Sequence, residues 1–209
     1  MKPLFSTLIS LVGENPLPIY LGIQQYAKPD ATIILVHSKD NGEQKGTRAQ
    51  AQAIGKMLTH PNIQYVETAP YKPSDVMTTL GTLLKNFPDA GLNYTGGTKV
   101  MSAFSVYEMS KQVPSEADLF SRVFYLEEGN GVFQFADDTQ DPFAPYIHLT
   151  LDDLCRLHDV LPHQKKYRNE IEKQGIKFAP ELKSESLSLE NLKNAYNARP
   201  NLYGCLLYT

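Results

Sequence analysis

Apolar and polar positions in the first 150 residues alternate between two periods. Short apolar runs rich in β-branched side chains predict buried strands, and segments with apolar residues three and four apart predict helices. In 47–58, for example, Ala49, Ala53, Ile54 and Met57 fall on one helical stripe. The expected strands are 4–12, 31–37, 63–68, 90–94, 122–127 and 132–136, and the expected helices are 17–26, 47–58, 75–86 and 99–111.

Strands that alternate with helices of about ten to fifteen residues are typical of βαβ units with right-handed crossovers. We therefore predict an α/β fold with a Rossmann-like, mainly parallel sheet flanked by helices. Asn130-Gly131 lies between the last two expected strands and predicts a late β-hairpin. Asn15, with Pro16 in the first turn, and Ser74 are expected to cap two of the helices.

The pattern changes near residue 150. Leu149–His158 predicts one more helix, capped by Thr150, after which the chain becomes polar and alternates Ser, Glu, Leu and Lys beyond Pro180. About sixty such residues are too few for an independent core. We expect a domain at residues 1–150 and, at 151–209, a helical linker or the start of an effector domain that is missing here.

The amino-acid composition excludes several classes of protein. The chain has 209 residues, a net charge of −3 and 42% hydrophobic residues, which is ordinary for a globular protein and a poor match to a duplex DNA binder. Its two cysteines support neither a disulfide framework nor a structural zinc site. No apolar run approaches a membrane span and no signal peptide is evident, so we expect a soluble cytoplasmic protein.

The strongest chemical signal is Thr95-Gly96-Gly97-Thr98-Lys99, between an expected strand and the following helix. Glycines let the backbone approach a ligand, and a helix N-terminus favours an anion through its unpaired N–H groups and its dipole. The threonine hydroxyls and Lys99 add donors and a positive charge. The spacing matches neither the P-loop nor the dinucleotide-binding fingerprint, so we predict an anion site of another kind.

Three other loops are expected at the same edge of the sheet, where parallel α/β sheets bind ligands. They follow the first three strands, at residues 13–16, 38–48 and 69–74. The second of these loops carries three cations, Lys39, Lys45 and Arg48. Together with Lys99 they would form a local positive cluster on a weakly acidic chain. Such a cluster favours a compact anion over an extended polyanion.

The stretch Leu92–Met101 resembles the Asn-x-Thr-Gly-Gly-Thr-Lys-x-Met signature of CRISPR-associated Rossmann fold (CARF) domains. The polar loop and Ala-rich helix at Ser38–Ile54 and the segment Leu149–His158 are also similar to this family. The resemblance covers about residues 5–160. It is strongest to the CARF domains of type III CRISPR ancillary effectors, which precede a nuclease or other effector domain.

This resemblance implies a sensor for cyclic oligoadenylates, with cyclic tetra-adenylate as the expected ligand. The ligand would lie on the twofold axis of a homodimer, which suits a ring that itself has twofold symmetry. It implies no catalytic residue, metal or cofactor in this segment, and no membrane or duplex DNA partner. The implied ligand contacts are Asn15, Pro16, Leu17, Ser38, Thr47, Thr95, Gly96, Gly97, Thr98 and Lys99.

Two alternatives stay open. In a ring nuclease, the same pocket would cut the ligand without metal, through attack by the ligand's own 2′-hydroxyl, with Lys99 stabilising the developing charge. In a transcription regulator, the tail would form a helix-turn-helix. Two nuclease-like fragments, Arg156 with His163 and Glu181-Leu182-Lys183, lack the surrounding domain that such chemistry needs.

Overall fold

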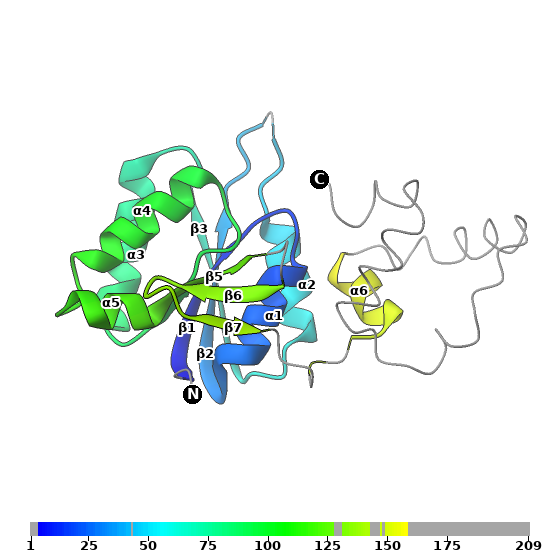
Figure 1. The fold of residues 1–209 in the computed structure, drawn as a ribbon. Helices are drawn as coiled ribbons and strands as arrows, with labels where there is room; N and C mark the ends of the chain where they lie inside the picture. Colours follow the sequence, from blue (N-terminus) through cyan, green and yellow to red (C-terminus); the bar gives the residue numbers. More distant parts are fainter. Residues whose placement is uncertain (1–3, 43, 128–130, 143–146, 148, 159–209) are drawn as a thin grey trace, which may run out of the picture. The chain divides into compact units, whose positions relative to one another are not determined.

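Seven strands form one sheet in the order β3-β2-β1-β4-β5-β6-β7 (Figure 1). The computed structural model describes residues 4–42, 44–127, 131–142, 147 and 149–158, and the chain divides after Ala144 into two units that we treat separately. The first five strands run parallel, and β6 and β7 are antiparallel to their neighbours. The strands are β1 (Phe5–Val12), β2 (Ala27–Ser38), β3 (Asn62–Thr68), β4 (Gly91–Asn93), β5 (Val123–Glu127), β6 (Val132–Phe135) and β7 (Gln140–Pro142).

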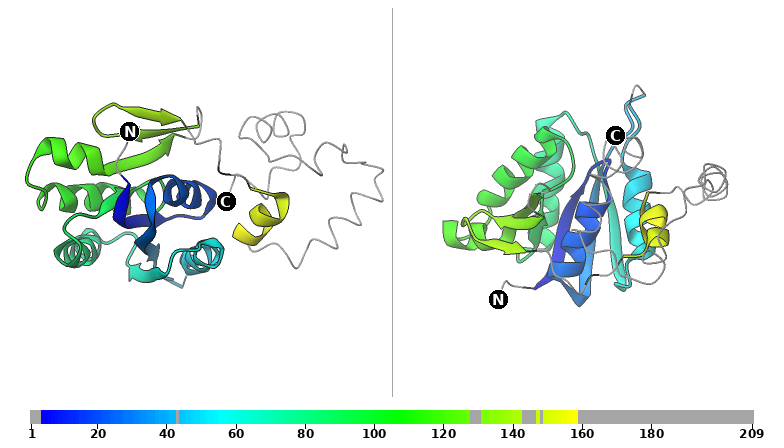
Figure 2. Two further views of the ribbon diagram at one scale, coloured as in Figure 1. Left: turned by 90° about the horizontal axis from the view of Figure 1, so that it is seen from below. Right: turned by 45° about the vertical axis from the view of Figure 1, so that its right-hand side comes forward.

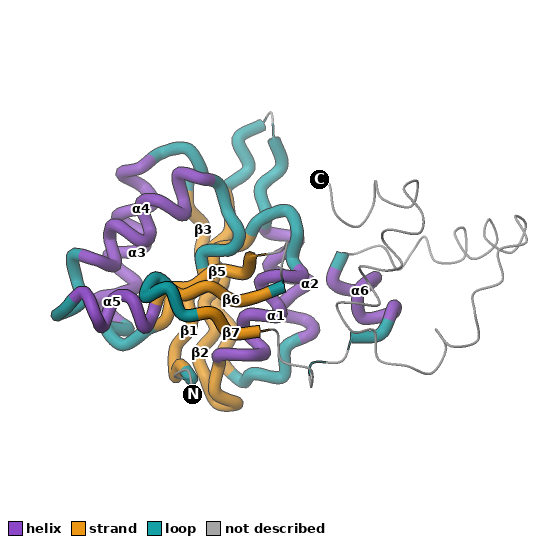
Figure 3. The backbone as a smooth tube through the Cα atoms, in the orientation of Figure 1, coloured by secondary structure: helices purple, strands orange, loops and turns teal. Residues whose placement is uncertain are grey.

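Helices cover both faces of this sheet (Figures 2 and 3). One face carries α1 (Leu17–Tyr26) and α2 (Arg48–Met57). The other carries α3 (Pro73–Asn86), α4 (Lys99–Ser110) and α5 (Glu116–Arg122). The second unit contributes α6 (Leu151–Leu157). The predicted α/β fold with a Rossmann-like sheet and a late hairpin is therefore confirmed.

The central strands are buried on both faces because helices cover both. Ile9, Leu11 and Ile34 face α3 and α4 in one core cluster. On the α1 side, Tyr26 packs against Phe124, Phe133 and Phe135, with ring centroids 4.6, 5.1 and 5.3 Å from its own. This aromatic cluster joins the late hairpin to the parallel part of the sheet.

Several element boundaries differ from the predicted ones. The first helix spans Leu17–Tyr26 as predicted, but the prediction that Asn15 caps it with Pro16 in the first turn is wrong, because Pro16 is the cap residue. Asn15 Oδ1 accepts a hydrogen bond from the Leu17 N–H at 3.2 Å. The prediction that Ser74 caps α3 is wrong. The helix begins at Pro73, which needs no N–H partner at that position, and its cap residue is Lys72.

Three elements were missed or shortened by the sequence prediction. β2 begins four residues earlier than expected, at Ala27, because Ala27 pairs with Phe5. The helix α5 and the three-residue strand β7 were not predicted. The helix expected near Thr150 is present, and the Thr150 hydroxyl and the Asp153 carboxylate form a capping box. The predicted tail beyond residue 158 lies outside the described residues.

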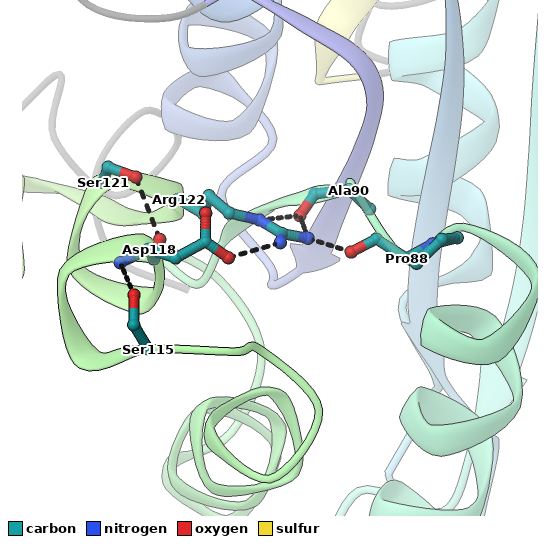
Figure 4. Close-up of polar contacts among 6 residues, drawn as sticks. All are labelled: Pro88, Ala90, Ser115, Asp118, Ser121 and Arg122. Carbon is teal, nitrogen blue, oxygen red and sulfur yellow. Dashed lines mark hydrogen bonds and ion pairs between the residues drawn. The ribbon is translucent and has the colours of Figure 1, made fainter.

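Arg122 fastens β4 to the end of α5 (Figure 4). Its guanidinium is buried, and it donates two hydrogen bonds to the Ala90 carbonyl, at 3.1 and 2.8 Å. It also donates to the Pro88 carbonyl and forms an ion pair with Asp118 at 2.9 Å. This cluster lies where β4 begins, at the opposite end of that strand from the glycine-rich sequence.

The order of the strands creates a switch point beside β1. The chain moves from β1 to β2 and β3 on one side and then returns to place β4 on the other side of β1. The loops after β1 and β4 therefore diverge to opposite faces of the sheet. Open α/β sheets bind ligands in the crevice at such a point, outside the carboxyl ends of the strands.

Candidate functional site

The glycine loop (residues 94–98) leaves β4 at this switch point and leads directly into α4. Gly97 has a φ of 82°, a left-handed conformation that side chains other than glycine adopt at a cost. Gly96 is buried beneath the β1–α1 loop (residues 13–16), where an added Cβ would lie 2.4 Å from the Leu11 carbonyl oxygen and 2.6 Å from the Gly13 nitrogen. The two loops therefore pack backbone against backbone.

Asn93 shapes the start of the glycine loop, a role that we did not predict. Its Oδ1 accepts hydrogen bonds from the Thr95 N–H at 3.1 Å and the Thr95 hydroxyl at 2.6 Å. The same hydroxyl accepts from the Leu126 N–H at 2.8 Å, which joins the loop to β5. The signal was present in the sequence, because an Asn two residues before a Thr is a common turn former.

Thr98 is the cap residue of α4 and also holds a neighbouring loop. Its Oγ1 accepts from the Met101 N–H at 3.2 Å. The same hydroxyl donates to the Pro70 carbonyl at 2.5 Å, and Pro70 lies in the β3–α3 loop (residues 69–72). The hydroxyl hydrogens of Thr95 and Thr98 are thus both used inside the protein. These two residues shape the loop, and the donors that remain at this end of α4 are the Lys99 ammonium and backbone N–H groups.

The N-terminus of α4 offers such groups. No hydrogen bond is described for the N–H groups of Gly97, Lys99 and Val100, whereas those of Met101 and Ser102 are bonded to Thr98. The helix dipole gives this end a partial positive charge. The Lys99 side chain is exposed beside it and forms no ion pair with a described residue. The arrangement can hold an anion by hydrogen bonds and charge together.

Ser38 and Thr47 lie together, but beneath the surface. The Ser38 N–H donates to Thr47 Oγ1, and the Thr47 N–H donates to Ser38 Oγ, both at 3.0 Å. Thr47 Oγ1 also donates to the Val12 carbonyl at 2.9 Å. With 8% and 7% of their surfaces exposed, these residues close the base of the β2–α2 loop (residues 39–47) and fasten it to β1.

The first predicted contact loop is partly accessible. Asn15 and Leu17 are partly buried, and Pro16 is buried. Because Asn15 Oδ1 already accepts the Leu17 N–H, its amide nitrogen is the group that can reach a ligand. Glu14, in the same loop, is exposed.

The cations of the predicted positive cluster are exposed. Lys39, Lys45 and Arg48 are exposed on the β2–α2 loop and the first residue of α2, and none of them forms an ion pair with a described residue. Unpaired cations near a crevice raise the local concentration of anionic ligands.

Two tyrosine rings pack together where the glycine loop begins, on the α4 face of the sheet. The rings of Tyr94 and Tyr125 lie 5.3 Å apart at a 45° tilt. Burial raises the pKa of the Tyr94 hydroxyl above its usual range, and the neighbouring Tyr125 adds to the rise. A tyrosine hydroxyl is neutral at physiological pH even at its ordinary pKa, so Tyr94 places no negative charge next to the anion site.

Neither a three-ligand metal cluster nor a membrane-spanning helix is found among the described residues. Within them, no three His, Cys, Asp or Glu side chains come close enough together to hold a metal ion. Among the helices described, none has the length and apolar character needed to cross a bilayer.

Comparison with known proteins gives a family and a fold. The sequence model of the Card1 CARF domain family matches residues 7–153. Can2 from Sulfobacillus thermosulfidooxidans, solved in complex with cyclic tetra-adenylate, is similar in structure, with a TM-score of 0.58, 17% identity, and 94% of this chain and 59% of that chain covered. Protein VC1899 from Vibrio cholerae has a TM-score of 0.56 and 9% identity, with 90% of this chain and 57% of that chain covered.

The chain thus spans less than two thirds of both solved structures. At these identities the similarity shows a shared fold. The search of curated proteins found no match.

Proposed function

The chain belongs to the Card1 CARF domain family, and we propose that it senses a cyclic oligoadenylate, cyclic tetra-adenylate in particular, in type III CRISPR antiviral defence. The observation that carries this proposal is the start of α4, where three unbonded N–H groups and the exposed Lys99 stand at the switch point of the sheet. Cyclic tetra-adenylate is the ligand in the Can2 structure with the same fold.

The local chemistry supports a small cyclic nucleotide. Its phosphates need a few N–H donors and cations in a crevice, which the glycine loop and the unpaired cations of the β2–α2 loop supply. The rest of the chain is weakly acidic, with a net charge of −3. A long nucleic acid would gain little from such a surface, whereas a compact anion needs only the local cluster.

Replacing Lys99 by alanine tests the anion site. A hydrogen bond to a charged group contributes about 1.5–3 kcal/mol, so we expect the variant to bind cyclic tetra-adenylate about tenfold or more weakly. Titration calorimetry on the full chain measures this change. Lys85→Ala is the matched control, because Lys85 is an exposed lysine in the last turn of α3. Equal affinity of the Lys99 variant and the wild type would contradict the assignment of Lys99.

We also propose that two chains share one ligand through α4. Val100 and Phe104 are partly buried, while Ala103 and Tyr107 are exposed, and these four residues lie on one stripe of the helix. Tyr107 keeps 54% of its surface exposed, and Lys111 Nζ lies 5.0 Å from the centre of its ring. The stripe starts next to Lys99. A second copy packed on it about a twofold axis would bring a second anion site close to the first.

The Tyr107→Glu variant tests this interface. A carboxylate in the middle of an apolar contact is costly to desolvate, so we expect the mass in solution to fall from twice 23.4 kDa to 23.4 kDa. Sedimentation equilibrium measures it. Thr82→Glu adds the same charge on the exposed side of α3 and should leave the dimer intact. A Tyr107 variant that remains dimeric would exclude this stripe as the interface.

The segment after residue 150 is proposed to connect the sensor with an effector. Of this segment the structure describes α6, whose capping box defines where the helix begins. In this account, ligand binding at the switch point is passed on through this segment.

A further inference from the structure

Tyr71 is an exposed aromatic side chain next to the proposed anion site. It lies in the β3–α3 loop and keeps 57% of its surface exposed, the largest exposed fraction among the large hydrophobic residues that the structure describes. An exposed tyrosine side chain can turn toward solvent at little cost in free energy, yet this side chain is held in place by a hydrogen bond. Its hydroxyl donates a 2.6 Å hydrogen bond to Gln44 Oε1 in the β2–α2 loop.

The backbone around Tyr71 is held as well. The Lys72 N–H donates to the Ala69 carbonyl at 3.3 Å, which closes a turn around Pro70 and Tyr71. On the other side, the Pro70 carbonyl accepts the 2.5 Å hydrogen bond from Thr98, the residue that caps α4. Tyr71 therefore stands between two of the proposed ligand loops, fixed to one through its hydroxyl and to the other through its neighbour.

This placement determines what Tyr71 can offer. Its hydroxyl hydrogen is used by Gln44, so the group left for a ligand is the flat face of the ring. Aromatic rings next to a phosphate-binding surface stack on nucleic acid bases. Since both anchoring contacts exist in the free protein, little side-chain freedom remains to be lost on binding.

We propose that Tyr71 is a stacking platform for one adenine base of the bound ring, and that Gln44 and the turn at Pro70 are its positioning groups. This inference rests on the proposed function, because it takes the phosphates to be held at the start of α4. It adds a recognition element for the base, which the anion site alone does not provide. In a twofold dimer the ring would meet two such platforms.

A cyclic tetra-adenylate that carries 2-aminopurine in place of adenine tests the stack directly, because the emission of 2-aminopurine falls when the base stacks on an aromatic ring. We expect strong quenching on binding to the wild type and partial quenching on binding to Tyr71→Phe, which keeps the ring but loses the hydrogen bond to Gln44. Tyr71→Leu keeps the apolar bulk and should quench much less. It should also bind the unmodified ring roughly tenfold more weakly, within the range that base–aromatic stacking covers.

The outcomes separate this inference from the proposed function. If the wild type binds no cyclic oligoadenylate, the proposed function fails and the platform with it. If the wild type binds and Tyr71→Leu matches it in affinity and in quenching, the platform is overturned while the function stands. Gln44→Ala should retain most of the affinity but show partial loss of quenching, because the ring is then free to rotate. Quenching unchanged in Gln44→Ala contradicts the positioning role.

Discussion

Gly96→Ala is expected to open the contact between the β1–α1 loop and the glycine loop and to abolish ligand binding. The added methyl group would meet the Leu11 carbonyl and the Gly13 nitrogen, at 2.4 and 2.6 Å. Both are backbone atoms on the central strand or directly after it, so neither can turn aside. Overpacking of this kind costs about 1–3 kcal/mol, and we expect a loss near the upper end of that range in urea unfolding.

Gly42→Ala is the matched control for this experiment. Gly42 also has a left-handed φ, of 85°, but nothing lies within 4 Å of its added Cβ. The free energy of unfolding of Gly42→Ala should therefore fall only by the cost of the strained backbone, about 1–2 kcal/mol. The variant should keep its affinity for the ligand. A Gly96 variant that is as stable as the wild type, or more stable than the Gly42 variant, would contradict the packing described for the two loops.

Arg122→Met is expected to destabilise the fold by about 2 kcal/mol, because a buried polar group without a partner costs about 1–3 kcal/mol and the Ala90 residue, whose carbonyl accepts two of the hydrogen bonds, is buried. The substitution keeps much of the side-chain length but removes every donor. The Ala90 and Pro88 carbonyls lose their hydrogen bonds, and Asp118 loses its ion pair (Figure 4). Chemical denaturation of the variant and the wild type measures the change.

Two further measurements show whether the effect of Arg122→Met comes from its buried hydrogen bonds. Lys85→Met removes an exposed cation from α3 and should change stability by less than about 0.5 kcal/mol. At ligand concentrations well above the dissociation constant, folded Arg122→Met should still bind, since the cluster lies at the opposite end of β4 from the glycine loop. A loss of stability below about 1 kcal/mol would contradict the hydrogen bonding assigned to this guanidinium.

The sequence allowed the α/β architecture to be predicted because its central strands are continuous apolar runs and its helices carry clear stripes. It also placed the glycine loop correctly, between β4 and α4. Elements without these patterns were missed. β7 is a three-residue strand that ends in a proline, and α5 is short and polar, although Ser115 caps it by accepting the Asp118 N–H. Lys28, Pro29 and Asp30 near the start of β2 are exposed and lack an apolar pattern, and the strand begins at Ala27 through its pairing with Phe5 in β1.

The site was harder to predict than the fold, because its side chains are committed to partners far away in the sequence. Thr98 donates to Pro70, and Thr47 donates to Val12. Local spacing cannot reveal such bonds. The hydroxyl groups that suggested ligand contacts prove to hold the loops together. Besides Lys99, the free donors are backbone N–H groups, which every residue except proline carries and which no sequence motif distinguishes.

The most direct test of the account is titration calorimetry of the full chain with cyclic tetra-adenylate, followed by analysis of the recovered ligand. The account predicts binding with one ring for two chains, a weaker interaction in Lys99→Ala, and a ligand that is recovered intact. Recovery of linear di-adenylate would instead identify a ring nuclease. The absence of binding to any cyclic oligoadenylate, in a folded wild-type protein, would contradict the proposed function.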